Sequence, residues 1–153
     1  MTTQSGFSVS EMIFTHRAPV RFHHCDPAGI IFYPKYFELA NEAVEAWTEA
    51  RLGLPFAELI GARGWGLPTV ALECEFAAPT RHGEALDYTI AVDRVGRSSL
   101  SLATAARAEG VTRMAMRSTL VLTDRAAGRP LPFPDDLRAR LEAEAALAKE
   151  ETR

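Results

Sequence analysis

Residues 23–29, His-His-Cys-Asp-Pro-Ala-Gly, place two imidazoles, a thiol and a carboxylate in one short segment. The proline and the glycine interrupt regular backbone structure, so the segment is expected to form a loop. Its carboxylate, Asp26, can attack a carbonyl carbon as a nucleophile or take a proton from water as a general base. A helical pattern begins at Pro34, a residue that suits a first helical turn. Asp26 is therefore expected to lie near unpaired N–H groups at the positive end of a helix, where a carbonyl would be polarised.

Other roles for these four reactive residues are weaker. Adjacent residues rarely converge on one metal ion, and no second ligand pair follows at zinc-site spacing, so no metal site is expected. Because neighbouring side chains in an extended segment alternate in direction, only one of His23 and His24 can face a pocket. The same alternation disfavours a Cys25 nucleophile with His24 as its base, and Cys25 is interpreted as a buried, inert thiol. Asp26 stands before a proline, as turn residues often do, so its type alone does not establish catalysis.

A long helix is expected directly after this loop, over residues 34–52. Apolar side chains recur there at spacings of three and four residues, and Gly53 follows as a stop signal. Further apolar residues lie off this stripe, at Phe37, Val44 and Ala46. We expect a helix with so broad an apolar surface to be wrapped by other elements rather than to rest on a surface.

Five segments have the alternation or the β-branched composition of strands. They are residues 12–22, 69–77, 86–92, 100–104 and 114–122. Glu109-Gly110 predicts a tight hairpin between the last two strands, and a short helical piece is expected at residues 56–60. The order of strand, loop, helix, four antiparallel strands and helix predicts an α+β fold, with one five-stranded sheet wrapped around the long helix.

The 153-residue chain is expected to form one domain at residues 12–133, with a polar tail at 1–11 and an amphipathic helix at 134–153. Seventeen Lys and Arg against twenty Asp and Glu give a net charge of −3 without a dense basic block, so nucleic acid is not an expected partner. The chain shows no signal peptide, no apolar run near the roughly 20 residues of a membrane span and no CxxC motif. A cytoplasmic protein without a membrane partner is expected.

Residues 20–37, Val-Arg-Phe-His-His-Cys-Asp-Pro-Ala-Gly-Ile-Ile-Phe-Tyr-Pro-Lys-Tyr-Phe, resemble the signature of the 4-hydroxybenzoyl-CoA thioesterase family of hotdog proteins. The similarity in order extends roughly over residues 14–123 and includes residues 95–99, Val-Gly-Arg-Ser-Ser, which look like the family's pantetheine-side hairpin. The resemblance implies a hotdog fold and an acyl-CoA thioesterase without metal or organic cofactor, CoA being part of the substrate. It also implies a homodimer or homotetramer with paired sheet edges and with active sites at the subunit interface.

The resemblance assigns roles to several residues of the loop. Asp26 matches the family's catalytic carboxylate, and the backbone N–H of Tyr33 takes the position of its oxyanion donor. His24, or its neighbour His23, is a further catalytic candidate, because some members carry a helpful histidine near this point. Gly29 is expected to let the loop turn back sharply beside the substrate.

Further candidates lie outside the loop. Asn41 stands where some members of the family carry an acidic residue, and it can orient water or bind a hydroxyl of the acyl group. Phe32, together with Trp47 and Trp65, is a candidate for the wall of an acyl pocket. On the strand at residues 69–77, a partner subunit can contribute Thr69, Glu73 or Glu75.

CoA carries phosphates, which require cationic or hydrogen-bonding side chains at the mouth of a pocket. Arg94, Arg97 and Ser98 are the first candidates, followed by Arg125 and Arg129, although exposed arginines also serve simply to keep a protein in solution. The expected substrate is a small, aromatic acyl-CoA of the hydroxybenzoyl or benzoyl type. Short or branched acyl groups, and a non-catalytic domain that binds acyl-CoA or acyl carrier protein, remain alternatives. A dehydratase is disfavoured, because no histidine opens the long helix.

Overall fold

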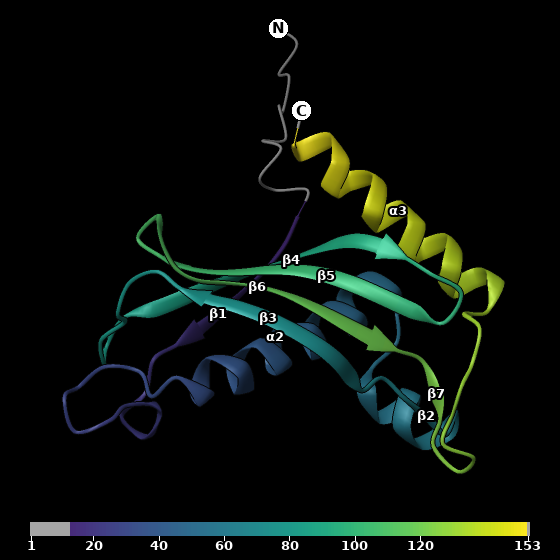
Figure 1. The fold of residues 1–153 in the computed structure, drawn as a ribbon, viewed down its shortest axis with the longest axis horizontal. Coiled ribbons are helices and arrows are strands. Elements are labelled where there is room, and N and C mark those ends of the chain that lie inside the picture. Colours follow the sequence, from purple (N-terminus) through teal and green to yellow (C-terminus); the bar gives the residue numbers. More distant parts are fainter. Residues whose placement is uncertain (1–12, 153) are drawn as a thin grey trace, which may run out of the picture.

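A five-stranded antiparallel sheet organises residues 13–152, the part of the chain that the computed structural model describes. Its strands are β1 (Phe14–Pro19), β3 (Thr69–Phe76), β4 (Ala85–Val95), β5 (Ser99–Ala108) and β6 (Val111–Val121). They lie side by side in the order β1-β4-β5-β6-β3. The helix α2 (Pro34–Leu52) packs across one face of the sheet (Figure 1). The predicted α+β class is confirmed, and the tail predicted at residues 1–11 lies outside the described residues.

Alternation along the strands separates the two faces of the sheet. In β4, the buried side chains Leu86, Tyr88, Ile90 and Val92 alternate with more exposed ones. The hydroxyl of Tyr88 donates to the backbone oxygen of Tyr36 at 2.9 Å, so the buried face is the one that meets α2. The other face, called the outer face below, carries small and charged side chains such as Asp87, Thr89 and Ala91. The period of two that predicts this strand is therefore the physical division between core and solvent.

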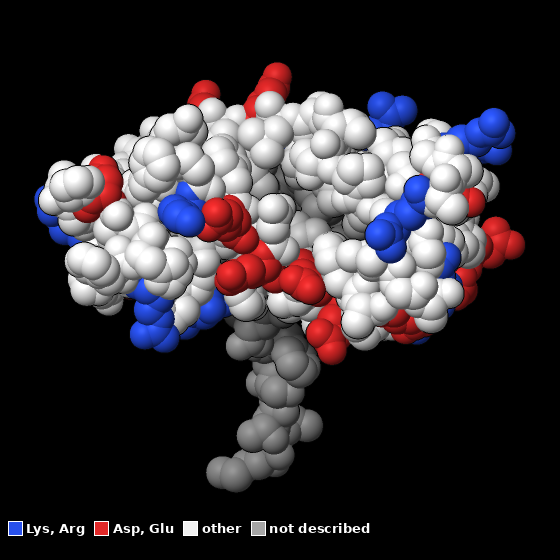
Figure 2. Space-filling model, turned by 90° about the horizontal axis from the view of Figure 1, so that it is seen from below, with Lys and Arg blue, Asp and Glu red and all other residues white. Residues whose placement is uncertain are grey.

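The helix α2 begins and ends where the sequence predicts. Gly53 follows it in a left-handed conformation, with a φ of 63°. Its buried side chains are Tyr36, Leu39, Ala40, Ala43, Val44, Trp47, Thr48 and Leu52, whereas Glu38, Asn41, Glu42, Glu45 and Glu49 are exposed. Figure 2 shows acidic side chains gathered in the middle of one face of the molecule, with basic ones towards both ends. The sheet covers one side of α2 and leaves the other open, so within one chain the helix is less enclosed than its composition predicts.

The C-terminal helix α3 (Asp135–Glu151) packs against β4 and α2 (Figure 1). The strand β1 pairs with β4 only from Ala85 to Ile90, and α3 contacts β4 as well. Leu137 and Leu141 of α3 are buried in the core. Glu144 accepts a hydrogen bond from the indole N–H of Trp47 at 3.4 Å, which ties α3 to the last turns of α2. The amphipathic helix predicted from the sequence is thus packed against the core.

A second, three-stranded sheet at one end of the molecule is absent from the sequence prediction. It consists of β2 (Trp65–Gly66), β7 (Thr123–Asp124) and β8 (Arg129–Pro130). The short helix expected at residues 56–60 is the π-helix η2 (Glu58–Ala62), and the predicted hairpin at Glu109-Gly110 is present, with φ values of 51° and 76°. Strands of two residues show no periodicity, which explains why sequence alone does not predict them.

Candidate active site

The loop before α2 is folded tightly around Asp26. Its backbone N–H donates to the oxygen of Ile30 at 2.9 Å, and the N–H of Gly29 donates back to the oxygen of Asp26 at 3.0 Å. Gly29 has a φ of 79°, a left-handed conformation that glycine adopts without strain. The N–H of Phe32 donates to the oxygen of His24 at 3.0 Å, which closes the loop at its base. The backbone therefore fixes the position of Asp26 before any substrate arrives.

The two carboxylate oxygens of Asp26 have different surroundings. Oδ1 accepts hydrogen bonds from the N–H of Ala28 at 2.9 Å and, more weakly, from that of Ile30 at 3.4 Å. Oδ2 accepts none from the residues that the structure describes. The residue is half-buried, so part of it remains exposed to solvent. Asp26 therefore acts as a turn residue, as expected of an aspartate before a proline. Its second carboxylate oxygen is nevertheless left without a hydrogen bond from the described residues.

The first turn of α2 lies at the end of this loop. Tyr33 precedes the helix with a φ of −52° and a ψ of −35°, and its side chain is exposed. Its carbonyl accepts from the N–H of Tyr36, and that of Phe32 accepts from the N–H of Lys35, while Pro34 has no N–H. No acceptor within residues 13–152 takes the N–H of Tyr33. This donor is available to an oxyanion, at the positive end of the helix.

His24 points into the protein, whereas His23 is exposed. Nδ1 of His24 accepts a hydrogen bond from the N–H of Arg21 at 2.9 Å, inside the short 3₁₀ helix η1 (Phe22–His24). Burial, and then the neighbouring His23, lowers the pKa of His24, so the neutral ring is favoured. With Nδ1 engaged by the backbone, the ring holds η1 in place and presents no free Nδ1 to a substrate.

Cys25 is half-buried rather than fully buried as the sequence suggests. Burial, with a smaller contribution from Asp26, raises the pKa of its thiol. Because the thiolate is the reactive form, a raised pKa disfavours a cysteine nucleophile here. Its Sγ lies 3.6 Å from the backbone oxygen of Arg21. The thiol is therefore unreactive by its electrostatics, not by complete burial.

An aromatic cluster adjoins the Asp26 loop at the end of β3. The ring of Tyr33 lies edge-on to Phe32 at 5.6 Å and to Phe76 at 6.1 Å. Phe76 also contacts Tyr36 at 5.5 Å and Phe37 at 6.1 Å. Phe32, Tyr33 and Phe76 are about half exposed, at 50%, 59% and 49%. The sequence gives no signal for Phe76, which resembles any other strand residue and meets the loop only through the tertiary fold.

Asn41 and Thr69 lie together on a separate groove. The groove has a volume of about 390 Å³ and runs between α2, β3 and β6. Phe37 and Leu72 also line it, and Phe37 contacts the aromatic cluster through Phe76. Asp26 is not part of its wall. Within one chain, these two candidates are near the loop through the aromatic side chains and not by direct contact.

The expected CoA contacts lie at the opposite end of the sheet from the Asp26 loop (Figure 1). Arg94 and Arg97 are exposed, and Ser98 is half-buried in the turn between β4 and β5. Arg138 of α3 donates to the backbone oxygens of Gly96 and Arg97 at 2.9 and 3.1 Å, which anchors this turn. A single chain therefore does not bring these residues to Asp26.

Other candidates also lie away from the loop. Trp47 is fully buried in the core, and Trp65 lies in β2 beneath the guanidinium of Arg63 at 4.9 Å. Arg125 donates to the backbone oxygen of Ile60 at 3.0 Å, and Arg129 belongs to β8. Within one chain the two tryptophans do not adjoin Asp26, and the expectation that they help to shape an acyl pocket stays a prediction.

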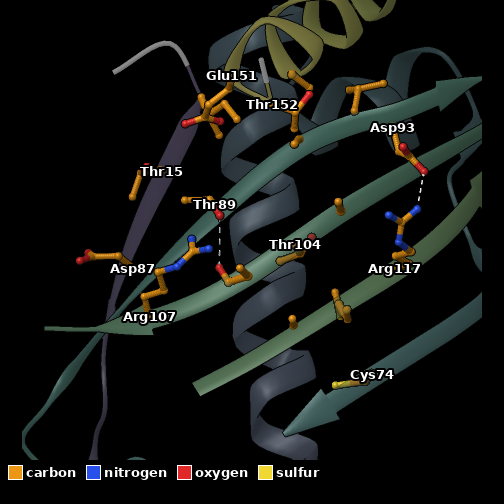
Figure 3. A pocket seen from close by; sticks show the side chains of 18 of the residues that line it. Thr15, Cys74, Asp87, Thr89, Asp93, Thr104, Arg107, Arg117, Glu151 and Thr152 are labelled. Carbon is orange, nitrogen blue, oxygen red and sulfur yellow. Dashed lines mark hydrogen bonds and ion pairs between the residues drawn. The ribbon is translucent and has the colours of Figure 1, made fainter. Parts of the chain in front are cut away.

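A broad hollow lies on the outer face of the sheet, away from the loop (Figure 3). It encloses about 1230 Å³ over a floor of small side chains, with residues Lys149 to Thr152 at one rim. Glu73 and Glu75 line it and thus face away from α2. An ion pair of 2.8 Å between Arg117 and Asp93 crosses the surface here. None of the helices that the structure describes has its N-terminus in this hollow, and we place the candidate site at the Asp26 loop instead.

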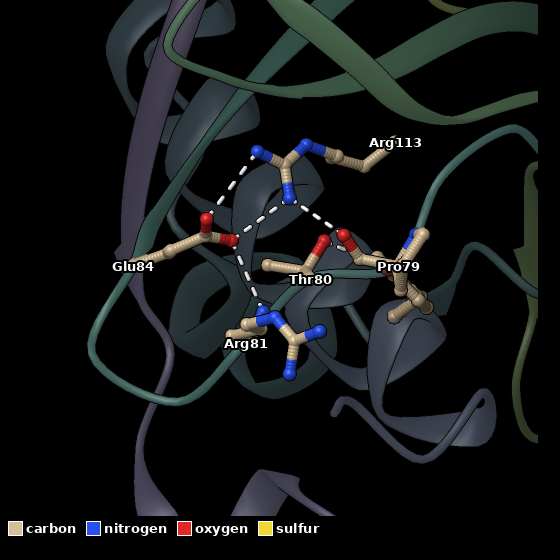
Figure 4. Close-up of polar contacts among 6 residues, drawn as sticks. Pro79, Thr80, Arg81, Glu84 and Arg113 are labelled. Carbon is tan, nitrogen blue, oxygen red and sulfur yellow. Dashed lines mark hydrogen bonds and ion pairs between the residues drawn. The ribbon is translucent and has the colours of Figure 1, made fainter. Parts of the chain in front are cut away.

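Sequence patterns also miss a buried ion pair. Arg113 alternates with apolar residues in the same phase as Arg117, which predicts that both face solvent. Arg113 is instead buried, and its guanidinium pairs with Glu84 at 2.8 Å (Figure 4). Arg113 is the extra residue of a bulge in β6, since Met114 pairs with Ala106 and Thr112 pairs with Arg107 of β5, which leaves Arg113 without a partner in the ladder. No sequence signal marks this bulge.

Within residues 13–152, no group of three or more His, Cys, Asp or Glu side chains is arranged to hold a metal ion. No described helix is long and apolar enough to cross a membrane.

Comparison with curated proteins supports a CoA thioester hydrolase. The chain is 26% identical over 129 residues to a 1,4-dihydroxy-2-naphthoyl-CoA hydrolase of Thermosynechococcus vestitus, an alignment that covers 84% of this chain and 88% of the relative. It is 27% identical over 73 residues to a hydrolase of the same name from Synechocystis sp.. That second match spans about half of either protein, 48% of this chain and 52% of the relative.

Solved structures share the fold. A thioesterase-superfamily protein from Jannaschia sp. superposes with a TM-score of 0.81 at 28% identity, over 86% of this chain and 92% of the other. A gentisyl-coenzyme A thioesterase superposes with a TM-score of 0.76 at 25% identity, over 84% and 99%. These similarities confirm the hotdog thioesterase fold expected from the sequence and support its enzyme class. Since residues 20–141 match the family as well, the chain belongs to the thioesterase-like superfamily.

Proposed function

We propose that this protein hydrolyses a small aromatic acyl-CoA to the free acid and CoA. The observation that carries the proposal is the surroundings of Asp26. One of its oxygens is held at 2.9 Å by the N–H of Ala28, and the other is unused, on the loop that ends at the unpaired N–H of Tyr33. A carboxylate and an oxyanion donor at a helix N-terminus are the two groups that thioester hydrolysis needs.

Oδ2 of Asp26 can act in two ways. As a nucleophile, it attacks the thioester carbonyl carbon, the C–S bond breaks, and CoA leaves as a thiolate while a mixed anhydride forms; water then cleaves the anhydride and restores the carboxylate. As a general base, Oδ2 takes a proton from a water molecule whose oxygen attacks the same carbon, and collapse of the intermediate again expels CoA. On both routes the N–H of Tyr33 donates to the oxygen that becomes negative, a contribution of about 3 kcal/mol for one such donor.

Three aromatic side chains support an aromatic acyl group. Phe32, Tyr33 and Phe76 leave about half of their surface exposed beside the loop, although apolar rings gain free energy when another apolar surface covers them. A flat acyl group can stack or pack edge-on against such rings. The relatives named above act, by their names, on dihydroxynaphthoyl and gentisyl thioesters, both of which are aromatic. Asn41 and Thr69, on the neighbouring groove, are candidates for a hydroxyl of the acyl group.

We further propose a homodimer or homotetramer in which chains pair through β3. This strand is at the edge of the sheet, and Val70, Leu72 and Phe76 are 61%, 44% and 49% exposed. A long, apolar strand edge is a template for pairing with another chain. Cys25 and Cys74 are both free thiols, which supports a reducing, cytoplasmic location as part of this proposal.

Pairing of two β3 strands would also account for the distance between Asp26 and the arginine candidates. In an antiparallel pair, the Thr69 end of one strand lies beside the Phe76 end of the other. The turn at residues 96–98 of the second chain would then lie at the same end of the joint sheet as the Asp26 loop of the first. Arg94, Arg97 and Ser98 are thus proposed to contact the CoA phosphates across the interface.

The proposed activity is tested by thiol release from benzoyl-, 4-hydroxybenzoyl-, phenylacetyl-, acetyl- and octanoyl-CoA. We expect the largest kcat/KM for an aromatic thioester. A larger value for acetyl- or octanoyl-CoA would contradict the proposed aromatic substrate. No release from any of the five by the folded protein would contradict the proposed thioesterase activity.

Light scattering at micromolar concentration tests the proposed assembly. The variant Leu72→Lys is expected to weaken it, and a monomeric wild-type protein would rule out pairing through β3.

A further inference from the structure

We infer that Arg113 and Glu84 are positioning residues that hold the Asp26 loop in place through the segment that connects β3 to β4. This segment, residues 77–84, is called the strap below. The inference rests on the proposed function, in which Asp26 is the reacting carboxylate. Neither Arg113 nor Glu84 is expected to touch the substrate, and their role is to hold the strap against the loop.

The strap lies along the Asp26 loop and is bonded to it by two backbone hydrogen bonds. The N–H of Ile31 donates to the oxygen of Thr80 at 2.9 Å, and the N–H of His82 donates to the oxygen of Gly29 at 3.1 Å. Ile30 and Arg81 form an antiparallel bridge between these two bonds. These contacts hold residues 29–31, which directly follow the turn at Asp26. A shift of the strap therefore moves the backbone that carries the carboxylate.

The strap also holds the first turn of α2. The hydroxyls of Thr80 and Tyr36 form a buried hydrogen bond of 2.8 Å. The backbone oxygen of Tyr36 in turn accepts from the hydroxyl of Tyr88 in the sheet. Because Tyr33 begins this turn, the strap links both groups that the proposed reaction needs, the carboxylate of Asp26 and the N–H of Tyr33.

Arg113 grips the strap near both of its ends (Figure 4). Its Nη1 donates to the backbone oxygen of Pro79 at 2.6 Å and to Oε2 of Glu84 at 2.8 Å, and its Nη2 donates to Oε1 of Glu84 at 3.4 Å. Oε2 of Glu84 also accepts from the backbone N–H of Arg81 at 3.0 Å. The planar guanidinium thus joins two points of one turn, which a lysine with its single ammonium group cannot reproduce.

Burial makes this pair sensitive to substitution. Arg113 is 8% exposed, and its Nε has no hydrogen-bond partner among the described residues. A buried cation requires its counter-ion, because removing one partner leaves a charge without compensation. The backbone N–H of Arg81, and then Arg113, hold the pKa of Glu84 below its usual value, so the carboxylate is charged near neutral pH.

We call the ion pair of Arg113 and Glu84, with its bond to Pro79, the clamp. Loss of the clamp should lower kcat rather than weaken substrate binding. Displacement of a reacting group by about 1 Å can lower the rate by about 100-fold, even when the substituted residue is far from the chemistry. The strap contains none of the residues proposed to bind the acyl group or CoA, so the affinity for the thioester should change little. A matched control exists on the same strand, since Arg117 pairs with Asp93 at 2.8 Å but is exposed on the outer face.

The experiment compares Arg113→Lys and Glu84→Gln with Arg117→Lys in the full-length protein. We expect kcat of Arg113→Lys to fall by about 10- to 100-fold, on the scale given by misplacement of a reacting group, with KM within about twofold of wild type. Glu84→Gln keeps the size of the side chain but removes the counter-ion of the buried guanidinium and one of its two acceptor oxygens, and its kcat should fall on the same scale. Arg117→Lys should match wild type in both parameters. Equal effects of Arg113→Lys and Arg117→Lys, or a loss confined to KM, would overturn the inference.

Amide hydrogen exchange supplies a readout that does not depend on turnover. In Arg113→Lys, exchange should accelerate at Ile31 and His82, whose N–H groups bond across the strap and the loop, and stay unchanged at Leu122 and Leu131. If the wild-type protein hydrolyses no thioester, this result still decides whether the clamp exists, while the proposed function fails on its own assay. Unchanged exchange at Ile31 and His82 would overturn the clamp. If Arg113→Lys does not fold, the same measurements on Glu84→Gln apply.

Discussion

Each end of the sheet carries an aspartate that holds a turn in the same way. Oδ1 of Asp26 accepts from the N–H of Ala28 at 2.9 Å, and Oδ1 of Asp124 accepts from the N–H of Ala126 at 3.0 Å. The turn of Asp26 leads into the N-terminus of α2, whereas the turn of Asp124 joins two strands of two residues each. The local chemistry is nearly identical. What differs is the element that follows, so the catalytic role proposed for Asp26 depends on the helix N-terminus beside it.

The largest effect should separate these two aspartates by activity. Asparagine keeps Oδ1 as an acceptor, so Asp26→Asn and Asp124→Asn should both preserve their turns and melt near the wild-type temperature. Loss of a nucleophile or general base should lower kcat of Asp26→Asn by about 1000-fold, a value within the usual range for such groups. Steady-state thiol release with the best substrate of the panel measures it. Asp124→Asn should retain wild-type kcat.

Two outcomes would break the comparison. Retained turnover in Asp26→Asn would remove this carboxylate from the mechanism. A large loss in Asp124→Asn would mean that the other end of the molecule takes part in the reaction directly.

A second pair of variants sharpens the comparison with a smaller effect. Gly29 and Gly128 follow the two aspartates, have φ values of 79° and 65°, and have no atom within 4 Å of an added Cβ. Substitution by alanine should therefore cost similar backbone strain at both, about 1–2 kcal/mol of unfolding free energy. Urea unfolding measures this cost. Only Gly29→Ala should also lower kcat, because it alone distorts the loop that carries Asp26, and equal kcat values would show that the loop tolerates the distortion.

The smallest effect concerns pH and again distinguishes the Asp26 end. The pKa of His24 is lowered from its usual value of 6.5, so below about pH 6.5 the unfolded chain takes up this proton before the folded one does. The free energy of unfolding should therefore fall on acidification below that value. Glu84, whose pKa is lowered from 4.5, adds a further loss in the same direction below about pH 4.5.

The variant His24→Asn separates the two contributions. Asparagine can still accept the N–H of Arg21 but does not titrate, so the variant should lose less stability than wild type between pH 7 and pH 5.5. Urea unfolding at these two pH values measures the difference. The same decline in both proteins would exclude His24 as its cause.

The elements that depend on local pattern were predictable. The helix at residues 34–52, the alternation in β4 and the hairpin at Glu109-Gly110 agree with the structure, because each follows from the conformational preferences of neighbouring residues. The position of Asp26 beside the start of the helix was predictable for a related reason. The loop, the carboxylate and the start of the helix are contiguous, so their order in the chain already brings them together.

Contacts between distant segments were not predictable in this way. Arg113 and Arg117 share one phase of the strand pattern, yet a bulge of β6 at Arg113 buries the first and leaves the second exposed. Phe76 and the strap reach the Asp26 loop only because β3 ends beside α2. A pattern of side chains along one strand contains no information on the register of its neighbour.

The sequence by itself therefore determined the elements, the fold class and the position of the Asp26 loop before α2, since these depend on interactions over a few residues. The tertiary structure decided which side chains surround that loop: the aromatic cluster, the buried ion pair that holds the strap, and the separation of Arg94 and Arg97 from Asp26 within one chain. The physical reason is that burial and pairing depend on the topology of the whole sheet. Residues far apart in sequence meet only after the sheet has formed around α2.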